Sequence, residues 1–439
     1  MSPSVVFINF ESILKKIQNM NITHLGEAKF KSPFTRSISE DLRVPEQIVH
    51  NIKTETDSGL QFELAGPREK IFFDPAKTRA GIVTCGGLCP GLNDVIRSLF
   101  NELVYAYGVA EVIGFRGGYQ GLDPDAGNKP IQLTHDFVDD IHQDGGTVLG
   151  TSRGPVDVKR AVDNLVNLGI NILFTIGGDG TQRGGNALFQ EAKKRGHALS
   201  VVGIPKTIDN DVAFVSRTFG YLTAVQEAAI VLDRAHIEAR SVEYGISLVK
   251  LMGRHAGFIA AGATVASQDV NFTLVPEVPF KLEGEGGFLA VLKERILNRK
   301  HALIVVAEGA GQDLLEESNA ARDASGNVLL KDIGLFMREK IESYFKIEQI
   351  PIIMRYIDPS YIIRSSPANA EDSILCDLFA RNAVHAAMAG KTGLVIGYLH
   401  DKFIHVPIEL LTSRTKTMDT NGLAWSAVLA STGQPEQFR

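Results

Sequence analysis

The sequence has few cysteines, no long apolar run and no excess of basic residues. Its 439 residues include three cysteines, Cys85, Cys89 and Cys376, without a second pair or a histidine cluster at zinc-binding spacing. We therefore expect a reduced, cytoplasmic chain rather than a disulfide framework or zinc module. No run reaches the roughly 18 apolar residues of a membrane span. The first residues also lack a basic segment leading into a signal-type apolar core, so no membrane partner is expected.

The charge balance argues against nucleic acid as a partner. Lys and Arg number 45 against 51 Asp and Glu, which gives a net charge of −6 at pH 7, so an anionic ligand must be met by cations placed locally. The 42 glycines and the 44% hydrophobic content are typical of an α/β enzyme. Because single cores rarely exceed about 250 to 300 residues, the length predicts two lobes.

Short β-branched runs alternate with helical patterns from Lys77 onward. In residues 1–76 the apolar residues show little regular spacing. This alternation predicts an α/β fold of two Rossmann-like parallel-sheet lobes with helices on both faces, plus an N-terminal extension. The expected strands are Ala80–Thr84, Val112–Phe115, Ile172–Ile176, Val201–Ile204, Ile246–Val249, Ala302–Ala307, Ile352–Met354 and Leu394–Ile396. The expected helices are Asn93–Tyr107, Val156–Leu168, Thr181–Arg195, Thr218–Ala239, Gly286–Arg299 and Asn369–Ala389.

We place the first lobe at 77–215, joined by part of the C-terminal region, the second at 216–406, and a C-terminal segment at 407–439. In open parallel sheets the ligand lies beyond the carboxyl ends of the strands. The loops that follow the strands are therefore the informative ones.

The loop Ile204–Asp211 reads Ile-Pro-Lys-Thr-Ile-Asp-Asn-Asp. Asp209 and Asp211 are two apart, so in an extended segment their side chains leave from the same side and can share a cation or a substrate hydroxyl. A Mg²⁺ ion or Lys206 is expected to offset their repulsion. The pattern is typical of phosphoryl transfer, although the same residues also suit a solvated acidic turn.

Two glycine-rich loops each join a strand to a helix: Gly86-Gly87-Leu88-Cys89-Pro90-Gly91 and Gly177-Gly178-Asp179-Gly180-Thr181. Free amides at such turns suit a phosphate. Neither loop has the Walker sequence or the dinucleotide fingerprint, and a lone glycine turn is more often structural. Asp179, placed to meet a Mg²⁺ ion on the phosphates, strengthens the binding hypothesis.

Further polar residues follow other strands: Met252-Gly253-Arg254-His255, Glu308, Arg355, and Tyr361 with Arg364. Arginine forks bind phosphate and a carboxylate accepts from sugar hydroxyls, so this set fits a phosphorylated sugar. Arg153 is another arginine whose guanidinium could donate hydrogen bonds to a phosphate. Each of these residues also has an ordinary structural role, because lone arginines usually lie on solvated faces or pair with carboxylates.

In this order the motifs resemble those of the 6-phosphofructokinases, over about Lys77 to Val406, and most resemble the ATP-dependent branch of plants, trypanosomatids and some bacteria. The resemblance implies the phosphofructokinase fold, with 77–215 as the nucleotide-binding lobe and 216–406 as the fructose 6-phosphate lobe. It implies Mg²⁺ as cofactor, with ATP and fructose 6-phosphate as substrates.

Carried to this chain, the resemblance implies that Asp209 is the general base for the 1-hydroxyl of fructose 6-phosphate, supported by Thr207 and Asp211. Lys206 and Arg254 would lie near the transferring group, and Asp179 would engage Mg²⁺. The residues implied around the nucleotide are Gly86, Gly87, Arg116, Arg153, Gly178, Asp179, Gly180 and Thr181. Those implied for the sugar phosphate are Thr207, Asp209, Met252, Gly253, Arg254, Glu308, Arg355, Tyr361 and Arg364.

In bacterial relatives the counterpart of Arg355 reaches a neighbouring subunit, which implies a homo-oligomer, at least a dimer and commonly a tetramer. Arg116 stands where those relatives have an adenine-stacking tyrosine.

Two positions concern the phosphoryl donor. Pyrophosphate-dependent relatives carry Asp where this chain has Gly180, and that carboxylate would repel the α-phosphate of ATP. Lys206, however, is shared with the pyrophosphate enzymes. The expectation is therefore an ATP-dependent enzyme, with a pyrophosphate-dependent enzyme as the alternative. Two lower-ranked alternatives are another kinase with Gly-Gly-Asp-Gly-Thr, such as an NAD or lipid kinase, and a non-catalytic sensor.

Overall fold

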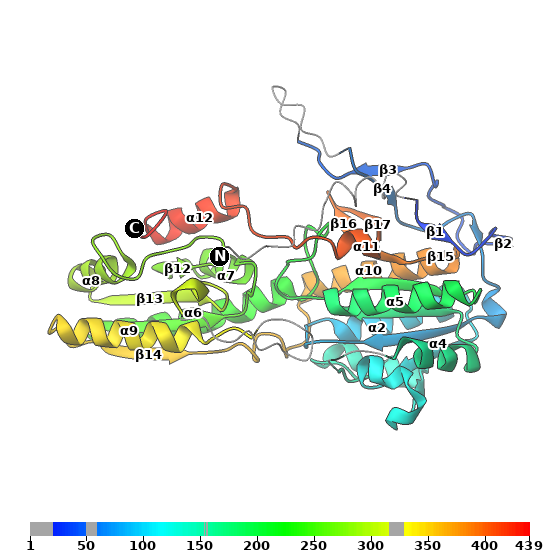
Figure 1. The fold of residues 1–439 in the computed structure, drawn as a ribbon, viewed down its shortest axis with the longest axis horizontal. Helices are drawn as coiled ribbons and strands as arrows, with labels where there is room; N and C mark the ends of the chain where they lie inside the picture. Colours follow the sequence, from blue (N-terminus) through cyan, green and yellow to red (C-terminus); the bar gives the residue numbers. More distant parts are fainter. Residues whose placement is uncertain (1–20, 50–58, 153, 155–156, 316–328) are drawn as a thin grey trace, which may run out of the picture.

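The computed structural model describes residues 21–49, 59–152, 154, 157–315 and 329–439, and within them the chain forms a large and a small lobe side by side (Figure 1). The large lobe contains a nine-stranded sheet in the order β3-β4-β17-β16-β10-β9-β6-β7-β8. Its strands are β3 Arg43–Pro45, β4 Gln61–Leu64, β6 Arg79–Thr84, β7 Glu111–Phe115, β8 Ile131–Gln132, β9 Ile172–Gly177, β10 Ser200–Pro205, β16 Leu394–Leu399 and β17 Lys402–Pro407. The five strands from β16 to β7 are parallel, and the outer pairs are antiparallel.

The small lobe has a four-stranded parallel sheet in the order β12-β13-β11-β14. Its strands are β12 Phe272–Leu274, β13 His301–Ala307, β11 Gly245–Leu251 and β14 Ile353–Ile357. Along β13, Ala302, Ile304 and Val306 face one core, whereas Leu303, Val305 and Ala307 face the other. This strand is apolar on both faces because helices cover both sides, as in other parallel sheets.

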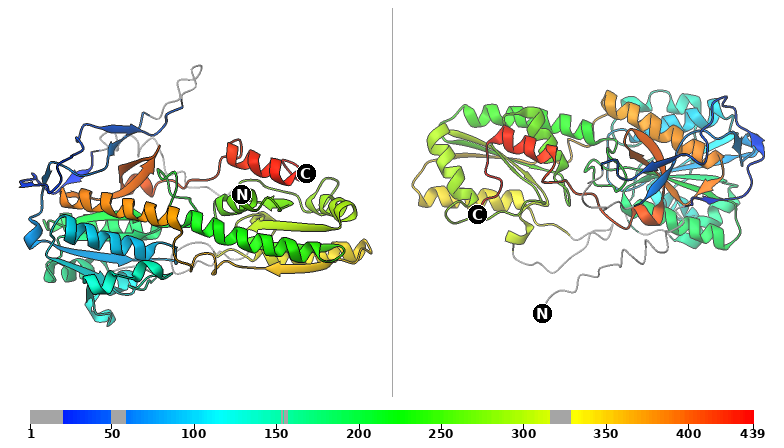
Figure 2. Two further views of the ribbon diagram at one scale, coloured as in Figure 1. Left: turned by 180° about the vertical axis from the view of Figure 1, so that it is seen from behind. Right: turned by 90° about the horizontal axis from the view of Figure 1, so that it is seen from above.

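Helices cover both faces of each sheet (Figures 1 and 2). On the large lobe, α2 (Leu92–Asn101) packs with α10 (Ala370–Met388), and α4 (Val158–Asn167) packs with α5 (Asp179–Lys194) on the opposite face. On the small lobe, α6 (Tyr221–Arg240) packs with α7 (Phe258–Ser267), and α8 (Phe288–Arg299) packs with α9 (Ile333–Ile347). The two-lobed α/β architecture expected from the sequence is confirmed.

All eight expected strands occur, within a few residues of the predicted bounds. The expected helix Asn93–Tyr107 is α2 followed by a π-helical turn, Glu102–Ala106. The sequence pattern did not reveal β12, β17, α7 or α9. Of these, β12 has three residues, which is too short to show an alternation of apolar and polar residues. The helix α7 is apolar nearly all round, so its sequence shows no distinct apolar face.

The structure corrects the expected range 216–406 for the second lobe. The segment α10–β17 lies in the large lobe, where Val202 and Gly203 of β10 pair with Leu394 and Val395 of β16. A parallel strand needs a long crossover, and the connection from β10 to β16 runs through the small lobe and ends with α10. The small lobe therefore spans about α6 to β14, and the segment after β17 returns to it through α12 (Leu423–Thr432), which packs on α7.

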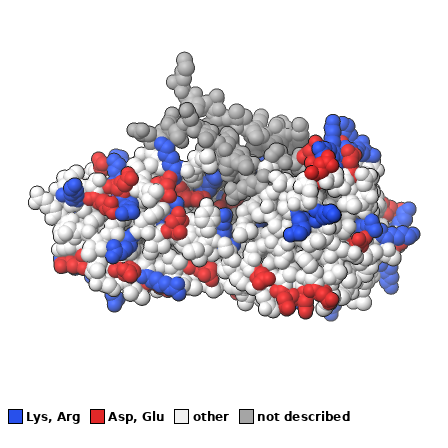
Figure 3. All heavy atoms as spheres, turned by 90° about the horizontal axis from the view of Figure 1, so that it is seen from below, with Lys and Arg blue, Asp and Glu red and all other residues white. Residues whose placement is uncertain are grey.

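The N-terminal extension is part of the large lobe. Its strands β3 and β4 continue the nine-stranded sheet beyond β17, β1 (Thr23–His24) pairs with β15 (Lys391–Thr392), and β2 (Phe30–Lys31) pairs with β5 (Lys70–Ile71). These strands have two to four residues, which explains the missing period. Acidic and basic side chains are interspersed on the face drawn in Figure 3. Among the described helices, none combines the length and apolar character needed to cross a bilayer.

Candidate active site

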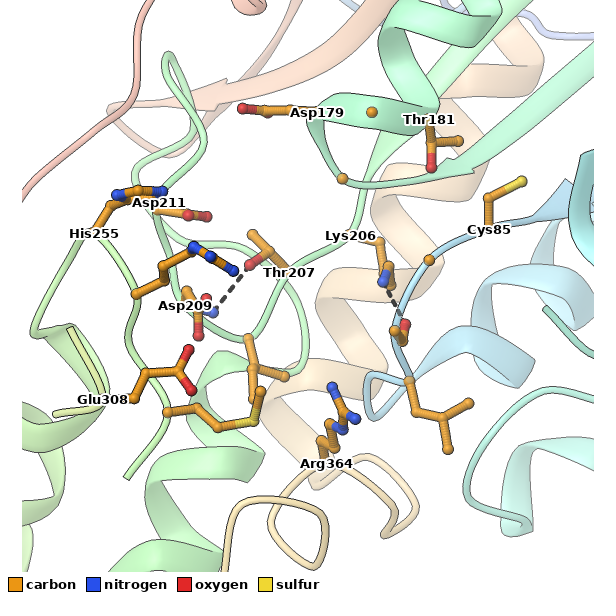
Figure 4. Close-up of a pocket in the computed structure, with 18 of the residues that line it drawn as sticks. Cys85, Asp179, Thr181, Lys206, Thr207, Asp209, Asp211, His255, Glu308 and Arg364 are labelled. Atoms are coloured by element: carbon orange, nitrogen blue, oxygen red, sulfur yellow. Dashed lines mark hydrogen bonds between the residues drawn. The ribbon is translucent and has the colours of Figure 1, made fainter. Parts of the chain in front are cut away.

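A cleft of about 1010 Å³ lies between the lobes, where the carboxyl ends of strands from both sheets meet. The large lobe contributes the loops after β6, β9 and β10, and the small lobe contributes those after β11, β13 and β14. The predicted residues that line it are Gly86, Gly87, Gly178, Asp179, Gly180, Thr181, Lys206, Thr207, Asp209, Asp211, Met252, Arg254, Glu308, Tyr361 and Arg364. Ten residues of the cleft are labelled in Figure 4.

The glycine loops leave open space on the nucleotide side expected from the sequence. Gly86 has a left-handed backbone, with φ of 85°. A Cβ atom on Gly178 would lie 3.6 Å from the Lys206 carbonyl oxygen, and one on Gly180 would meet only the Arg183 guanidinium, at 3.9 Å. The helix α5 begins at Asp179, so its first amides face this space. Free amides beside open space provide a phosphate-sized anion site.

The loop after β10 is held by its own polar groups. The Thr207 hydroxyl accepts from the Asp209 amide (3.0 Å), and the Asn210 side chain accepts from the Thr218 amide (3.0 Å). The Thr218 hydroxyl donates to the Thr207 carbonyl oxygen (2.7 Å). Asn210 adopts φ of 56°, a left-handed conformation that Asn tolerates better than most residues. These bonds present the Asp209 and Asp211 side chains to the cleft (Figure 4).

Asp209 lies among other acids. Its Oδ1 atom is buried and has no hydrogen-bond partner among the described residues. Burial raises its pKa well above the usual range, and the Asp211 and Glu308 carboxylates raise it further, while Lys206 and Arg364 oppose the change. Burial also raises the pKa of Asp211 and of Glu308. The cleft is therefore prepared for a positively charged group or a proton donor beside Asp209.

Lys206 extends from the end of β10 to the first glycine loop. Its side chain is buried, and its ammonium donates to the Gly87 carbonyl oxygen. One lysine thus links the phosphate-sized space to the acidic loop.

The carboxylates fit a magnesium ion that arrives with phosphates. Burial and the neighbouring Asp211 raise the pKa of Asp179 to about 6, so a cation would stabilise both ionised carboxylates. No three His, Cys, Asp or Glu side chains converge as a complete metal centre in the described ranges. Mg²⁺ commonly uses one or two carboxylates plus substrate phosphates and water, so Asp179 and Asp211 suffice as protein ligands.

The small lobe contributes loop backbone and further cationic side chains. Gly253 has φ of 133°, and its carbonyl oxygen accepts from the Gly309 amide (3.1 Å). A Cβ on Gly309 would lie 1.9 Å from the Arg254 carbonyl oxygen, so the two loops pack backbone to backbone. Arg254 Nη2 is buried without a partner among the described residues, and it lines the same cleft as Glu308.

Across the cleft, the Arg364 guanidinium lies 4.9 Å from the Tyr361 ring centroid. Two guanidinium groups, those of Arg254 and Arg364, thus line one cleft together with the Glu308 carboxylate. Such a set can bind a phosphorylated polyol.

Three predicted residues within the described ranges do not line the cleft. Gly253 contributes a backbone hydrogen bond to the neighbouring loop. Arg116, which follows β7, is not among the lining residues. Arg355 lies on β14, the edge strand of the small sheet, with its side chain 55% exposed and 4.0 Å from Glu238. Arg153 lies outside the described residues.

The lining residues that the sequence interpretation missed include Arg183, Lys250 and Thr415. Arg183 follows Asp179 by four positions on α5, a spacing that places both on one helix face. Thr415 comes from a distant segment and carried no sequence signal.

Lys250 Nζ lies 2.8 Å from both Asp332 and Asp358. Burial alone would lower the Lys250 pKa, but these hydrogen bonds outweigh it and raise it. Lys250 thereby joins the start of α9 to the loop that carries Tyr361 and Arg364.

Comparison with known proteins relates nearly the whole chain to one family. The family model described as Phosphofructokinase matches residues 79–387. A protein of Borreliella burgdorferi named "ATP-dependent 6-phosphofructokinase" is 46% identical over 440 residues, covering 96% of this chain and 98% of the relative. "ATP-dependent 6-phosphofructokinase" of Trypanosoma brucei brucei is 48% identical, covering 84% and 76%.

"ATP-dependent 6-phosphofructokinase 7" of Arabidopsis thaliana is 46% identical, covering 91% and 81%. Among solved structures, a pyrophosphate-dependent phosphofructokinase from Marinobacter aquaeolei superposes with a TM-score of 0.68 at 19% identity, covering 82% of this chain and 93% of that one. That identity supports the fold alone. On its sequence relatives and on the family match over most of its length, the chain belongs to the phosphofructokinase family.

Proposed function

We propose that this protein is an ATP-dependent 6-phosphofructokinase, which transfers the γ-phosphoryl group of ATP to the 1-hydroxyl of fructose 6-phosphate. The products are fructose 1,6-bisphosphate and ADP. The observation that carries the proposal is one cleft in which Asp209, with an unpartnered buried oxygen, lies between a glycine-lined space and the Arg254, Glu308 and Arg364 side chains. Members of the family with up to 48% identity are named for this activity.

In the proposed mechanism, Asp209 accepts the proton of the 1-hydroxyl as that oxygen bonds to the γ-phosphorus and the bond to the β,γ-bridging oxygen breaks. Thr207 holds the loop through its bond to the Asp209 amide. Lys206 and Arg254 supply positive charge near the transferring group. Asp179 and Asp211 would hold a bound Mg²⁺ ion, which would supply positive charge beside the phosphates.

The proposed sugar-phosphate site uses Arg364 and Tyr361 for the 6-phosphate and Glu308 and the Met252–Gly253 backbone for the hydroxyls. The guanidinium groups of Arg254 and Arg364 would balance the charge of a dianionic phosphate ester in a cleft that is otherwise acidic. Gly86, Gly87, Gly178, Gly180 and Thr181 surround the proposed nucleotide phosphates.

The choice of ATP over pyrophosphate rests on Gly180. A side chain at this position would point into open space, because a Cβ there meets only the Arg183 guanidinium at 3.9 Å. The free space admits an α-phosphate and the rest of a nucleotide. Pyrophosphate-dependent relatives also carry a lysine at the position of Lys206. The second candidate function is therefore pyrophosphate–fructose 6-phosphate phosphotransferase.

A donor assay tests the proposal. One preparation is supplied with fructose 6-phosphate, Mg²⁺ and either ATP or pyrophosphate, and fructose 1,6-bisphosphate is measured. We expect turnover with ATP and little with pyrophosphate. Turnover with pyrophosphate alone would establish the second candidate, and turnover with neither donor would overturn both.

We further propose a cytoplasmic homo-oligomer, at least a dimer and in the family's common form a tetramer. Arg355, exposed on the edge strand β14, is the residue we assign to a neighbouring subunit's sugar-phosphate site.

A further inference from the structure

A segment near the C-terminus, Ser413–Met418, runs along the loop that carries Asp209 and Asp211. It leads from α11 (Ile408–Leu411) in the large lobe to α12 on the small lobe (Figure 1). The Lys416 amide donates to the Asp211 carbonyl oxygen (2.9 Å), and Thr415 forms an antiparallel bridge with Val212. Because Thr415 also lines the cleft, this segment borders the acidic loop directly.

The Lys416 side chain reaches across the same loop. Its ammonium donates to the carbonyl oxygens of Val215 (2.6 Å) and Ser216 (3.1 Å), residues 201 and 200 positions earlier. It also lies 5.0 Å from the ring centroid of Phe258, at the start of α7 in the small lobe. One cation therefore contacts the acidic loop and the small lobe together.

Lys416 is also electrostatically coupled to the site. Burial lowers its pKa to about 8, and the nearby Asp211 carboxylate opposes that change. The ammonium in turn lowers the pKa of Asp211 against the larger effect of burial. The Lys416 side chain thus lies close to the Asp211 carboxylate without lining the cleft.

The residues around Lys416 anchor the segment at both ends. On one side, Arg414 pairs with Glu46 of the N-terminal extension and lies 4.2 Å from the Phe214 ring centroid. On the other side, the Met418 amide donates to Glu277 (2.9 Å), whose carboxylate also accepts from the Gly257 amide (3.0 Å). With both ends fixed, Lys416 is held at a defined position beside the loop.

We propose that Lys416 is a positioning residue, which fixes the Asp209–Ser216 loop against the small lobe so that the Asp209 carboxylate meets the substrate hydroxyl. The inference rests on the proposed function, since it assumes that Asp209 acts on a substrate held by the small lobe. Lys416 has this effect because two loop carbonyl groups share its ammonium. A misplacement of the base by about 1 Å is expected to cost on the order of 10²-fold in rate.

The test compares Lys416→Met with Lys416→Arg, and with Lys402→Met as a matched control. Met keeps much of the side-chain length but removes the ammonium, Arg restores a cation, and Lys402 is exposed on β17. We expect Lys416→Met to lower kcat by about 10- to 100-fold with KM for both substrates changed less than about threefold. Lys416→Arg should recover most of the loss, and the control should match the wild type.

A second measurement separates positioning from a purely structural role. If Lys416 acts through Asp209, Lys416→Met should lower kcat by less than about twofold in an Asp209→Asn background. An equal loss in both backgrounds, or a Lys416→Met enzyme with wild-type kcat, would overturn the inference. Thermal unfolding checks that each variant is folded, and Lys416→Gln replaces Lys416→Met if the latter does not fold. An inactive wild type would instead overturn the proposed function.

Discussion

A single carboxylate, that of Asp209, has the surroundings expected of a general base: burial, two acidic neighbours and an oxygen atom without a partner among the described residues. Asp209→Asn keeps the shape of the side chain and removes the proton acceptor. We expect kcat to fall by a factor on the order of 10² or more, with nucleotide affinity nearly unchanged.

Steady-state kinetics and calorimetric titration with nucleotide measure the two quantities. The control is Asp136→Asn, a substitution at a fully exposed carboxylate of the large lobe. Unchanged turnover in Asp209→Asn would show that another group accepts the proton.

Gly180 is the residue that decides the donor in this proposal. Its backbone has no left-handed strain and its Cβ position is open, so Gly180→Asp should fold normally and place a carboxylate where the α-phosphate of ATP would lie. We expect kcat/KM with ATP to fall more than about tenfold, because like charges close together cost several kcal/mol.

Gly180→Asn is the matched control, since it has the same size without the charge. It should retain more activity with ATP than Gly180→Asp. Equal losses in both variants would mean that size, rather than charge, excludes the nucleotide.

At the scale of elements, the loop after β10 depends on the left-handed conformation of Asn210. Asn210→Ala loses the bond to the Thr218 amide and places Ala in a conformation that costs roughly 1–2 kcal/mol. The loop should relax, and kcat should fall while the protein stays folded. Asn210→Gly, which keeps the backbone freedom, should retain more activity.

Gln268 provides a matched control for that experiment. It ends α7 with a similar left-handed backbone, φ of 60°, and does not line the cleft. Because Gln and Ala both carry a Cβ atom, Gln268→Ala should add little left-handed strain and leave kcat unchanged. Comparable losses of kcat in both variants would trace the effect to general stability rather than to the loop.

At the scale of the whole molecule, a buried charge cluster joins the N-terminal extension to the large lobe. Lys391 Nζ lies 2.7 Å from Glu63 and 3.1 Å from Glu40, and Arg68 lies 2.5 Å from Glu63. His405, fully buried, lies 3.3 Å from Glu63. Burial lowers the His405 pKa to about 4, with Glu63 opposing the change.

The lowered pKa of His405 predicts that the free energy of unfolding falls in acid. The unfolded chain takes up a proton near pH 6.5, whereas the folded chain does so only near pH 4. Stability from neutral His405 is therefore present above pH 6.5 and lost as the pH falls toward 4, with a slope approaching about 1.4 kcal/mol per pH unit. His405→Leu should flatten the pH dependence of the urea unfolding midpoint between pH 7 and 5.

The control for the pH experiment is His135→Leu, at an exposed histidine of the large lobe. It should leave the slope as in the wild type. A His405→Leu variant with the wild-type slope would assign the acid sensitivity to other groups.

The sequence by itself determined the alternation of strands and helices and the identity of about half of the residues that line the cleft. Strand ends in a parallel sheet share one edge, so Asp179 and Asp209, which follow neighbouring strands of one sheet, could be assigned to one cleft from their loops alone. Arg254 follows a strand of the other sheet, and its assignment to that cleft came from the family resemblance. Periodicity is a local property, and these segments are long enough to show it.

Only the tertiary structure decided which lobe each distant segment joins. That β16 pairs with β10, that β3 and β4 extend the large sheet, and that Lys416 contacts Val215 are contacts between residues far apart in the chain. Such contacts produce no regular spacing of residues in the sequence, because they depend on complementary surfaces that form only when the elements pack.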